Sequence, residues 1–373
     1  MADAVSNLPS SLVLALLPTG GNLAFRQLCA ELGAPACWGE MMFARSLLRG
    51  HPIERARLKR APGEKLYCAQ IATNAIDEGA GVLEALEYSS TSFVSLNCGC
   101  PKSKITAKGL GTALLRRPEK LDKPVEGLVS NSNRAIEMKV RLSPTGEEAR
   151  NIHELADAVE AAGASALTIH GRTKEARYTK SADWNAIEDV ARKLSIPVIG
   201  NGDVLTLAEC ELRSRGGSTA AVMAGRGALI KPWLFWEVSN GAEWHPTAPE
   251  RIKAVYFRLA QLMRDHFGPD DIRGSRYDTF MPWHLSFLQR VRPLPSSEYS
   301  TSLQDPLIQR RFGDIMPHES EEEVSLLKHL LRKEGQDTFD AMANELWHSD
   351  SSDDATARLQ RLAEELLGEK KGS

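Results

Sequence analysis

The sequence predicts an α/β protein, a (β/α)₈ (TIM) barrel followed by a smaller all-helical C-terminal domain. About eight short apolar runs alternate with amphipathic stretches over about 240 residues, and polar side chains gather where those runs end. Helical periodicity replaces this alternation beyond about Trp244. The predicted parts are 1–245 for the barrel, 246–348 for the helical domain and 349–373 for a solvated connector with a terminal helix.

The predicted strands are short and apolar, as expected for parallel strands that are covered on both faces. They span residues 12–17, 36–40, 66–71, 93–96, 137–140, 166–170, 197–200 and 220–223. The active site of such a barrel lies at the carboxyl ends of its strands. The polar residues at or just after those ends are Gln70, Asn97, Lys139, Arg141, His170, Asn201, Asp203 and Arg226.

The composition is that of a globular protein, since 42% of the 373 residues are hydrophobic and 25% are charged. Six cysteines without a repeated CxxC spacing argue for a reducing compartment and against a disulfide framework or a metal site. The apolar run 12–17 is too short for a signal or membrane segment, and no Lys or Arg precedes it. We therefore expect an intracellular protein without a metal, in the cytoplasm or alternatively the nucleus.

The segment 95–117, SLNCGCPKSKITAKGLGTALLRR, is the most informative stretch of the chain. An apolar strand leads into a Cys-Pro turn, where Asn97 ends the strand, Gly99 lets the backbone approach a ligand and Pro101 fixes the turn that presents Cys100. A lone cysteine is more often a packed core residue. The basic, glycine-spaced loop that follows favours a reactive thiol instead.

This segment resembles the tRNA-dihydrouridine synthases, flavoenzymes in which Asn-x-Gly-Cys-Pro is followed by Lys-Gly-x-Gly-x-Ala-Leu. The matching residues are Asn97, Gly99, Cys100, Pro101, Lys108, Gly109, Gly111, Ala113 and Leu114. The resemblance covers about residues 12–291. It is strongest to the eukaryotic subgroup that acts on uridine 47 of tRNA, in the stretches GNLAFRQLCAELGAPACWGEM, HGRTKEARYTKSADW, RGALIKPWLFWEV and WHLSFLQRV.

The resemblance implies that the barrel binds FMN. The implied FMN-binding residues are Leu16, Leu17, Pro18, Gln70, Lys139, His170, Asn201, Gly202, Asp203, Gly225 and Arg226. Several of them lie in the loops GNGDV and AGRGAL, after the last two predicted strands, where barrels commonly bind phosphate. Two departures from the family pattern are Leu-Leu-Pro at 16–18, where the family usually has Pro, a hydrophobic residue and Thr, and Ser95, where many members have Asp.

The implied reaction is the reduction of a tRNA uridine to 5,6-dihydrouridine. NADPH, or alternatively NADH, reduces FMN, which passes hydride to C6 of the uracil while Cys100 protonates C5 as a general acid. The base must leave its stack to react. Candidate tRNA contacts are Asn97, Lys108, Arg141, Arg172 and Lys180, with Lys102, Lys104 and Arg177 beside them, and the alternative is that several of these are only solvated.

Helices are predicted at 250–267, 275–291, 319–333 and 338–347, followed by the polar connector SDSSDDATAR and a final amphipathic helix. We expect this region to dock tRNA, because arginines recur along it with aromatic residues between them. They are Arg251, Arg258, Arg273, Arg276, Arg290 and Arg292, with Tyr256, Tyr277 and Trp283. The alternative is a helical cap that only buries barrel surface, as the apolar cluster at 283–288 would suit.

Two other functions fit parts of the sequence. One is a non-catalytic RNA-binding barrel that has lost its flavin, to which the altered segment 16–18 points. The other is an FMN reductase of free pyrimidines, against which the helical domain and the basic loop argue. The modified uridine, the choice between NADPH and NADH, and the oligomeric state are questions for experiment.

Overall fold

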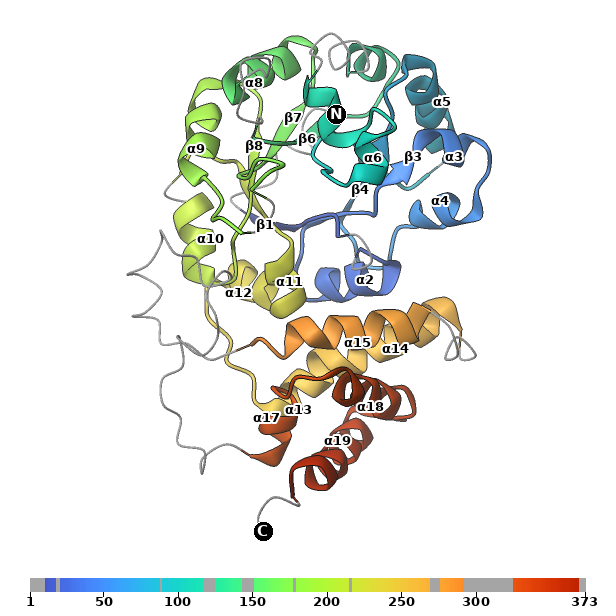
Figure 1. Cartoon of the computed structure of the whole chain (residues 1–373), viewed down its shortest axis with the longest axis vertical. Coiled ribbons are helices and arrows are strands. Elements are labelled where there is room, and N and C mark those ends of the chain that lie inside the picture. The colour runs from blue at the N-terminus through green and yellow to red at the C-terminus, as the bar shows by residue number, and fades with distance from the viewer. Residues whose placement is uncertain are drawn as a thin grey trace.

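Parallel strands form a closed ring in the computed structural model of the protein (Figure 1). The strands are β1 (Ser11–Leu14), β2 (Ala36–Trp38), β3 (Met42–Phe43), β4 (Leu66–Ala72), β5 (Phe93–Asn97), β6 (Ile136–Arg141), β7 (Ala166–His170), β8 (Val198–Asn201) and β9 (Ala221–Ala224). Around the ring they follow the order β2-β1-β9-β8-β7-β6-β5-β4, and the pairing of β2 with β4 closes it. The predicted (β/α)₈ barrel is therefore confirmed.

The structure describes residues 11–17, 21–87, 89–116, 125–142, 151–176, 179–214, 217–268, 276–291 and 325–368. Among these residues, no helix has the length and apolar character that a membrane crossing requires.

The strand at the edge of the ring, β3, was not predicted from the sequence. It pairs only with the end of β4, through Met42 opposite Ile71 and Phe43 opposite Ala72. A strand of two residues leaves no period of alternation in the sequence. Its effect is to carry Met41 and Phe43 to the mouth of the barrel, where both line the cavity described below.

The side chains of the strands alternate between the surrounding helices and the barrel interior. On β6, Ile136, Met138 and Val140 belong to the hydrophobic layer beneath the helices, so Glu137, Lys139 and Arg141 face inward. Apolar side chains fill the amino-terminal part of the interior; they are Val13, Ala36, Phe93, Ala166, Ile199 and Ala221. Polar side chains replace them toward the carboxyl ends of the strands, as the sequence predicts.

Helices cover the outside of the ring (Figure 1). They are α2 (Leu23–Glu31), α3 (Ala44–Leu48), α4 (Pro52–Arg57), α5 (Ile76–Glu87), α6 (Ser103–Thr106), the 3₁₀ helix η1 (Gly111–Arg116), α8 (Ile152–Ala161), α9 (Trp184–Lys193), α10 (Leu207–Ser214), α11 (Arg226–Ile230) and α12 (Leu234–Asn240). Side-chain caps fix several of their starts. Asn151 and Glu154 form a capping box at α8, and Asp183 caps α9.

The remaining helices pack together beside α2, α11 and α12 (Figure 1). They are α13 (Ala248–Arg251), the π-helical segment η2 (Ile252–Phe257), α14 (Arg258–Phe267), α15 (Arg276–Leu288), α17 (Leu326–Leu330), α18 (Gln336–Trp347) and α19 (Ser352–Leu367). The ring of Phe25 on α2 lies 4.9 Å from that of His284 on α15, and His284 Nε2 lies 3.0 Å from the Leu229 carbonyl oxygen. Helical region and barrel thus share one continuous core.

The polar stretch 349–358 is not a solvated connector, and that prediction was wrong. Helix α19 begins inside it at Ser352, because the Ser351 side chain accepts the backbone N–H of Asp354 and caps the helix. Ala355 and Leu359 are then fully buried. The polar composition belongs to the exposed face of an amphipathic helix.

Part of the predicted RNA-docking surface of the helical region is core. Tyr256 and Tyr277 are each only 1% exposed and Arg251 is 5% exposed. The guanidinium of Arg258 pairs with Glu31 of the barrel at 2.6 Å. These four side chains therefore build the helical region and fasten it to the barrel, as the cap alternative expects, while Arg273 and Arg292 lie outside the described residues.

Candidate active site

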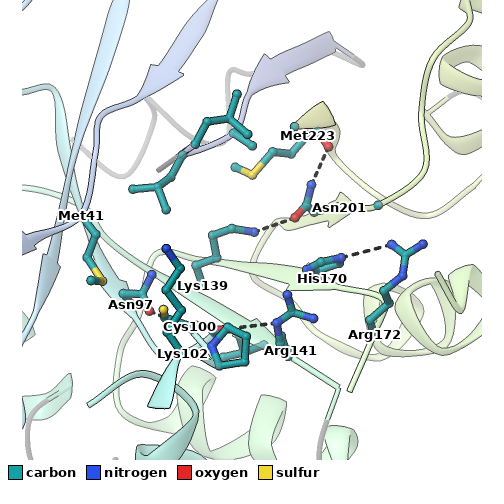
Figure 2. Close-up of a pocket in the computed structure, with 18 of the residues that line it drawn as sticks. Met41, Asn97, Cys100, Lys102, Lys139, Arg141, His170, Arg172, Asn201 and Met223 are labelled. Carbon is teal, nitrogen blue, oxygen red and sulfur yellow. Dashed lines mark hydrogen bonds between the residues drawn. The ribbon is translucent and has the colours of Figure 1, made fainter. Parts of the chain in front are cut away.

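A cavity of about 1250 Å³ opens at the carboxyl ends of the strands. Inward-facing strand-end residues line it together with the loops that follow. Most of the predicted site meets here; Leu16, Leu17, Asn97, Cys100, Lys139, Arg141, His170, Arg172, Asn201, Gly202, Asp203, Gly225 and Arg226 all line the cavity. In Figure 2, Asn97, Cys100 and Lys102 lie on one side of Lys139, and His170 and Arg172 on the other.

The loop that carries Cys100 is held by hydrogen bonds on both flanks. The Cys100 backbone N–H donates to Asn97 Oδ1 at 3.0 Å, and its carbonyl oxygen accepts the Thr112 N–H at 3.1 Å. Arg141 Nε donates to the Gly99 carbonyl oxygen at 2.9 Å. Since backbone partners fix the loop, the Cys100 thiol is left to face the cavity.

Burial distinguishes Cys100 from the other cysteines. Cys29, Cys37, Cys68, Cys98 and Cys210 are buried, and Cys100 is half-buried and lines the cavity. Burial raises the pKa of each of the five buried thiols, which keeps them protonated and unreactive. The thiol that the sequence singles out is thus the one placed to meet a ligand.

A chain of amide hydrogen bonds lies behind Cys100. Asn97 Nδ2 donates to Gln70 Oε1 at 2.6 Å, and Gln70 Nε2 donates to Ser95 Oγ at 3.0 Å. Gln70 is fully buried and is not among the residues that line the cavity. In this structure the Gln70 amide orients Asn97. The predicted contact of Gln70 with the cofactor stays a prediction.

Lys139 lies at the centre of the cavity floor, and its ammonium donates to Asn201 Oδ1 at 2.8 Å (Figure 2). Asn201 Nδ2 in turn donates to the Met223 carbonyl oxygen at 2.7 Å, which fixes the amide. Burial lowers the pKa of Lys139 from 10.5 to about 7, against the opposing attraction of Glu137, while Arg141 lowers it further. The amine is therefore poised to gain or lose its proton near neutral pH.

Asp203 connects two arginines at the other side of the cavity. Arg172 Nη2 donates to Asp203 Oδ1 at 2.6 Å, and Arg226 Nη2 donates to the same oxygen at 3.1 Å. Burial, and then the positive charge of Arg141, Lys139, Arg172 and Arg226, hold the pKa of His170 well below its usual range. The imidazole is thus neutral and can act there as a hydrogen-bonding group.

The structure places Arg172 differently from the prediction that it contacts tRNA. Arg172 is 1% exposed and its Nε donates to the Lys180 carbonyl oxygen at 2.6 Å. Together with the Asp203 pair, these contacts commit its guanidinium to holding the loops in place. The sequence could not reveal this role, because the carboxylate partner comes 31 residues later, on another loop.

Glycine is required where two of the loops approach neighbouring segments of the chain. A Cβ on Gly227 would lie 1.9 Å from the Val204 carbonyl oxygen, and one on Gly202, whose φ is +137°, would lie 2.6 Å from the Ala182 Cβ. No other residue fits these positions without moving the chain. The loops after β8 and β9 can thus come close together where they line the cavity.

The other predicted residues lie around the mouth. Lys108 is exposed, with its Nζ 5.0 Å from the Phe43 ring centroid, and Lys180 is exposed. Pro18 and Arg177 lie outside the described residues. Sequence reasoning missed Met41, Phe43, Arg57, Lys174 and Met223, which all line the cavity; for Met41 the signal was its place directly after the second predicted strand.

The cavity is positively charged. Its cationic side chains outnumber its carboxylates: Arg57, Lys102, Lys139, Arg141, Arg172, Lys174 and Arg226 against Glu40, Glu175 and Asp203. The arrangement suits an anionic occupant. Among the described residues no cluster of His, Cys, Asp and Glu could hold a metal ion.

The family model described as "Dihydrouridine synthase (Dus)" matches residues 14–286, which is most of the chain. The chain belongs to the dihydrouridine synthase family. Among its relatives, the tRNA-dihydrouridine(47) synthase [NAD(P)(+)] of Coprinopsis cinerea is 36% identical over 299 residues, 75% of this chain and 44% of the relative. The proteins of Arabidopsis thaliana and Homo sapiens, each named tRNA-dihydrouridine(47) synthase [NAD(P)(+)]-like, are 36% and 34% identical.

These two alignments cover 76% of this chain, and 41% and 43% of the Arabidopsis and human relatives. This dihydrouridine synthase family member thus spans less than half the length of the relatives that it matches. The matched part contains every lining residue of the cavity, since they run from Ala15 to Gly227.

Proposed function

We propose that this chain is a tRNA-dihydrouridine synthase, which binds FMN in its cavity, takes reducing equivalents from NADPH or NADH and reduces a tRNA uridine to 5,6-dihydrouridine. The observation that carries the proposal is that the Cys100 thiol and the buried Lys139 amine line the same cationic cavity. The setting is inside the cell, where tRNA is found. The names of the relatives favour position 47 of tRNA.

The residues present fit FMN. Ligand cavities commonly enclose about 300–1000 Å³, so a volume of about 1250 Å³ has room for the cofactor and a nucleobase beside it. Arg226 and the close-packed glycine loops would hold the phosphate, and Leu16 and Leu17 would pack against the ring. Asn201 and Lys139 present an amide and an amine toward the same space. The altered segment 16–18 keeps two apolar side chains in the lining and so gives little support to a barrel that has lost its flavin.

Bound FMN, once reduced, would supply the hydride that adds to C6 of the uracil. Cys100 holds the proton that C5 needs, on Sγ, and its loop is fixed by Asn97 and Thr112 so that the thiol stays oriented. Lys139 is buried at the floor of the cavity and places a positive charge there when protonated, where it can offset negative charge that develops during reduction. His170 stays neutral and can donate or accept a hydrogen bond.

The mouth of the cavity suits an extruded nucleotide. Met41, Phe43 and Cys100 pack against one apolar cluster, which a base that has left its stack could contact. Lys102, Lys104 and Lys108 are exposed just beyond, on α6 and the segments that flank it, where ammonium groups can meet phosphates. A free pyrimidine would use none of these lysines, which favours an RNA substrate.

Replacement of Cys100 by Ala tests the proposal. The variant should keep FMN and oxidise NADPH, while the rate of dihydrouridine formation in tRNA falls by about 10²- to 10⁴-fold, the usual contribution of a positioned general acid. Cys98→Ala is the matched control, because Cys98 is fully buried outside the cavity and its loss should leave turnover largely intact. A wild-type chain that neither retains nor rebinds FMN would refute the function, and an undiminished rate in Cys100→Ala would refute the acid role.

A further inference from the structure

A carboxylate lies within the barrel below the cavity floor. Glu137 is fully buried on β6, two residues before Lys139 and on the same inward face. Its closest neighbours across the sheet are Ser95 on β5 and Ala166 on β7, with which it is in register. It thus lies between the apolar part of the barrel interior and the polar residues of the site.

The contacts of this carboxylate leave half of it unsatisfied. Glu137 Oε2 accepts a hydrogen bond from the Trp38 indole at 3.2 Å, whereas Oε1 is buried and makes no hydrogen bond within the described part of the chain. Ionised carboxylates at such depth are strongly unfavourable unless a cation or several donors compensate them. Burial raises the pKa of Glu137, and the Ser95 and Thr168 hydroxyls and Lys139 act in the opposite direction.

Lys139 is the cation nearest along the strand. Residues two apart in a strand lie on the same face and about 7 Å apart, and both Glu137 and Lys139 are buried. Two opposite charges at this distance attract each other appreciably in a protein interior, and much less in water. The Lys139 amine donates its hydrogen bond to Asn201. The Glu137 carboxylate therefore attracts the amine through its charge, without replacing that hydrogen bond.

We propose that Glu137 is a positioning residue whose buried carboxylate keeps Lys139 charged and directed into the cavity. The inference rests on the proposed flavin site, because Lys139 serves that site. The paired position on the adjacent strand is Ser95, which carries no charge, so Glu137 supplies the carboxylate at this level of the barrel.

Other ionisable groups surround the pair. On β6, Arg141 opposes protonation of Lys139; from β7, His170 faces the amine but is neutral. Cys100 lies on the loop after β5, and Arg172, Asp203 and Arg226 lie farther around the cavity. Near Glu137, burial raises the pKa of Cys68 on β4 and of Cys98, which stay neutral thiols. Among all these groups, Glu137 is the one that raises the pKa of Lys139.

The test is a titration of the Lys139 amine by ¹³C NMR in flavin-free protein with labelled lysine, the signal being assigned by its loss in Lys139→Met. Glu137→Gln keeps the shape of the side chain and removes the charge. We expect the pKa of Lys139 to fall by on the order of one pH unit or more in this variant. An unchanged pKa would overturn the proposal.

Two double variants separate charge from packing. Ser95→Asp with Glu137→Gln restores a carboxylate at the paired position and should return the pKa of Lys139 toward about 7. Ser95→Asn with Glu137→Gln is the uncharged control and should leave the pKa of Lys139 as low as in Glu137→Gln alone. This comparison remains decisive if Glu137→Gln alone fails to fold, and equal pKa values in the two double variants would reject the charge-based role.

The affinity for FMN, followed by quenching of its fluorescence at pH 7, gives a second readout. Glu137→Gln should weaken binding several-fold, and the restored carboxylate should recover it. Failure of the wild-type chain to bind FMN would remove the proposed function but leave the titration standing. A shifted pKa without any change in affinity would instead show that Lys139 is not a cofactor contact.

Discussion

The energetic coupling between Glu137 and Lys139 can be predicted from their place on β6. The two side chains lie on one face of the strand, about 7 Å apart, and are fully buried and 9% exposed, respectively. With an effective dielectric constant of about 20, two unit charges at this distance attract by about 2 kcal/mol. A double-mutant cycle with Glu137→Gln and Lys139→Met should therefore give a coupling of about 2 kcal/mol at a pH where both are charged.

The cycle isolates this attraction from the contacts that each mutation also removes. Lys139→Met deletes the hydrogen bond to Asn201, but it does so in both arms of the cycle, so that loss cancels. Glu137→Gln keeps an oxygen that can accept the Trp38 N–H. The doubly neutral variant should be about as stable as the wild type or more stable, because it no longer buries two charges.

The pH dependence follows from the lowered pKa of Lys139. Below about pH 7 the folded protein carries the protonated amine; above it the folded state loses this proton, while the unfolded chain keeps it until about pH 10.4. The free-energy cost of burying a charged Lys139 therefore decreases as the pH rises above 7. The attraction between Lys139 and Glu137 is lost over the same range, because the folded protein no longer holds the proton. Urea unfolding of the four flavin-free proteins should give a coupling of about 1 kcal/mol at pH 6, because the amine is only partly protonated there once Glu137 is neutral, and almost none at pH 9.

A coupling below about 0.5 kcal/mol at pH 6, or the same coupling at both pH values, would refute the reasoning. The first result would mean that Glu137 is already neutral in the folded protein. The second would mean that the two residues interact by packing, because packing does not depend on the proton of Lys139. Lys253→Met is the matched surface control, since Lys253 is exposed on η2 and should show no coupling to Glu137.

Two further predictions concern the loop and the core. Gly111→Ala should destabilise the protein by at least about 1–2 kcal/mol and change the reactivity of the Cys100 thiol toward Ellman's reagent. The reason is that Gly111 has a φ of +61° and that an added Cβ would lie 2.5 Å from the Cys100 carbonyl oxygen. Gly63→Ala, where φ is +80° and no atom lies within 4 Å of the added Cβ, is the control for backbone strain alone. Glu64→Gln should lower the unfolding free energy by about 3 kcal/mol in urea titrations, because it leaves Arg26 buried without its carboxylate partner at 2.8 Å. Glu78→Gln is the control; it breaks the exposed pair of Glu78 with Arg45 and should lower the unfolding free energy by less than about 1 kcal/mol.

The sequence predicts the barrel because parallel strands are covered on both faces. Their apolar runs stand out from the amphipathic helices, and the polar residue that ends each run marks the carboxyl end of a strand. Asn97, Lys139, His170 and Asn201 were found by that position alone, and all four line the cavity. Here a local pattern is sufficient, because the topology brings all strand ends to one side of the barrel.

The sequence does not predict which polar residues the protein uses on itself. Arg172 and Gln70 lie at or near strand ends like the others, yet the carboxylate partner of Arg172 comes from a distant loop and the partners of Gln70 come from the neighbouring strand. Tyr256 and Tyr277 likewise read as surface aromatics until the packing of the helical region buries them. Burial depends on contacts between segments far apart in the chain, and one sequence does not contain that information.

The start of the predicted final helix was misplaced, although it left a local signal. Ser351 and Asp354 stand three residues apart, the spacing of a helix N-cap and its third residue, and apolar residues follow at helical intervals. The polar composition of the stretch concealed this pattern. Composition describes the exposed face of α19, whereas periodicity describes the face that packs, and the two must be weighed together.

The polar residues of the barrel interior have an order that explains why its charges remain useful. Apolar side chains fill the amino-terminal part of the interior, then Glu137 follows, then Lys139 with Asn97 and Asn201. Each of these buried charges thus has an opposite charge or an amide next to it. The exposed lysines at the mouth are different, because salt weakens their attraction to phosphates. The floor of the cavity should therefore stabilise a charge with less dependence on ionic strength than the exposed lysines at the mouth.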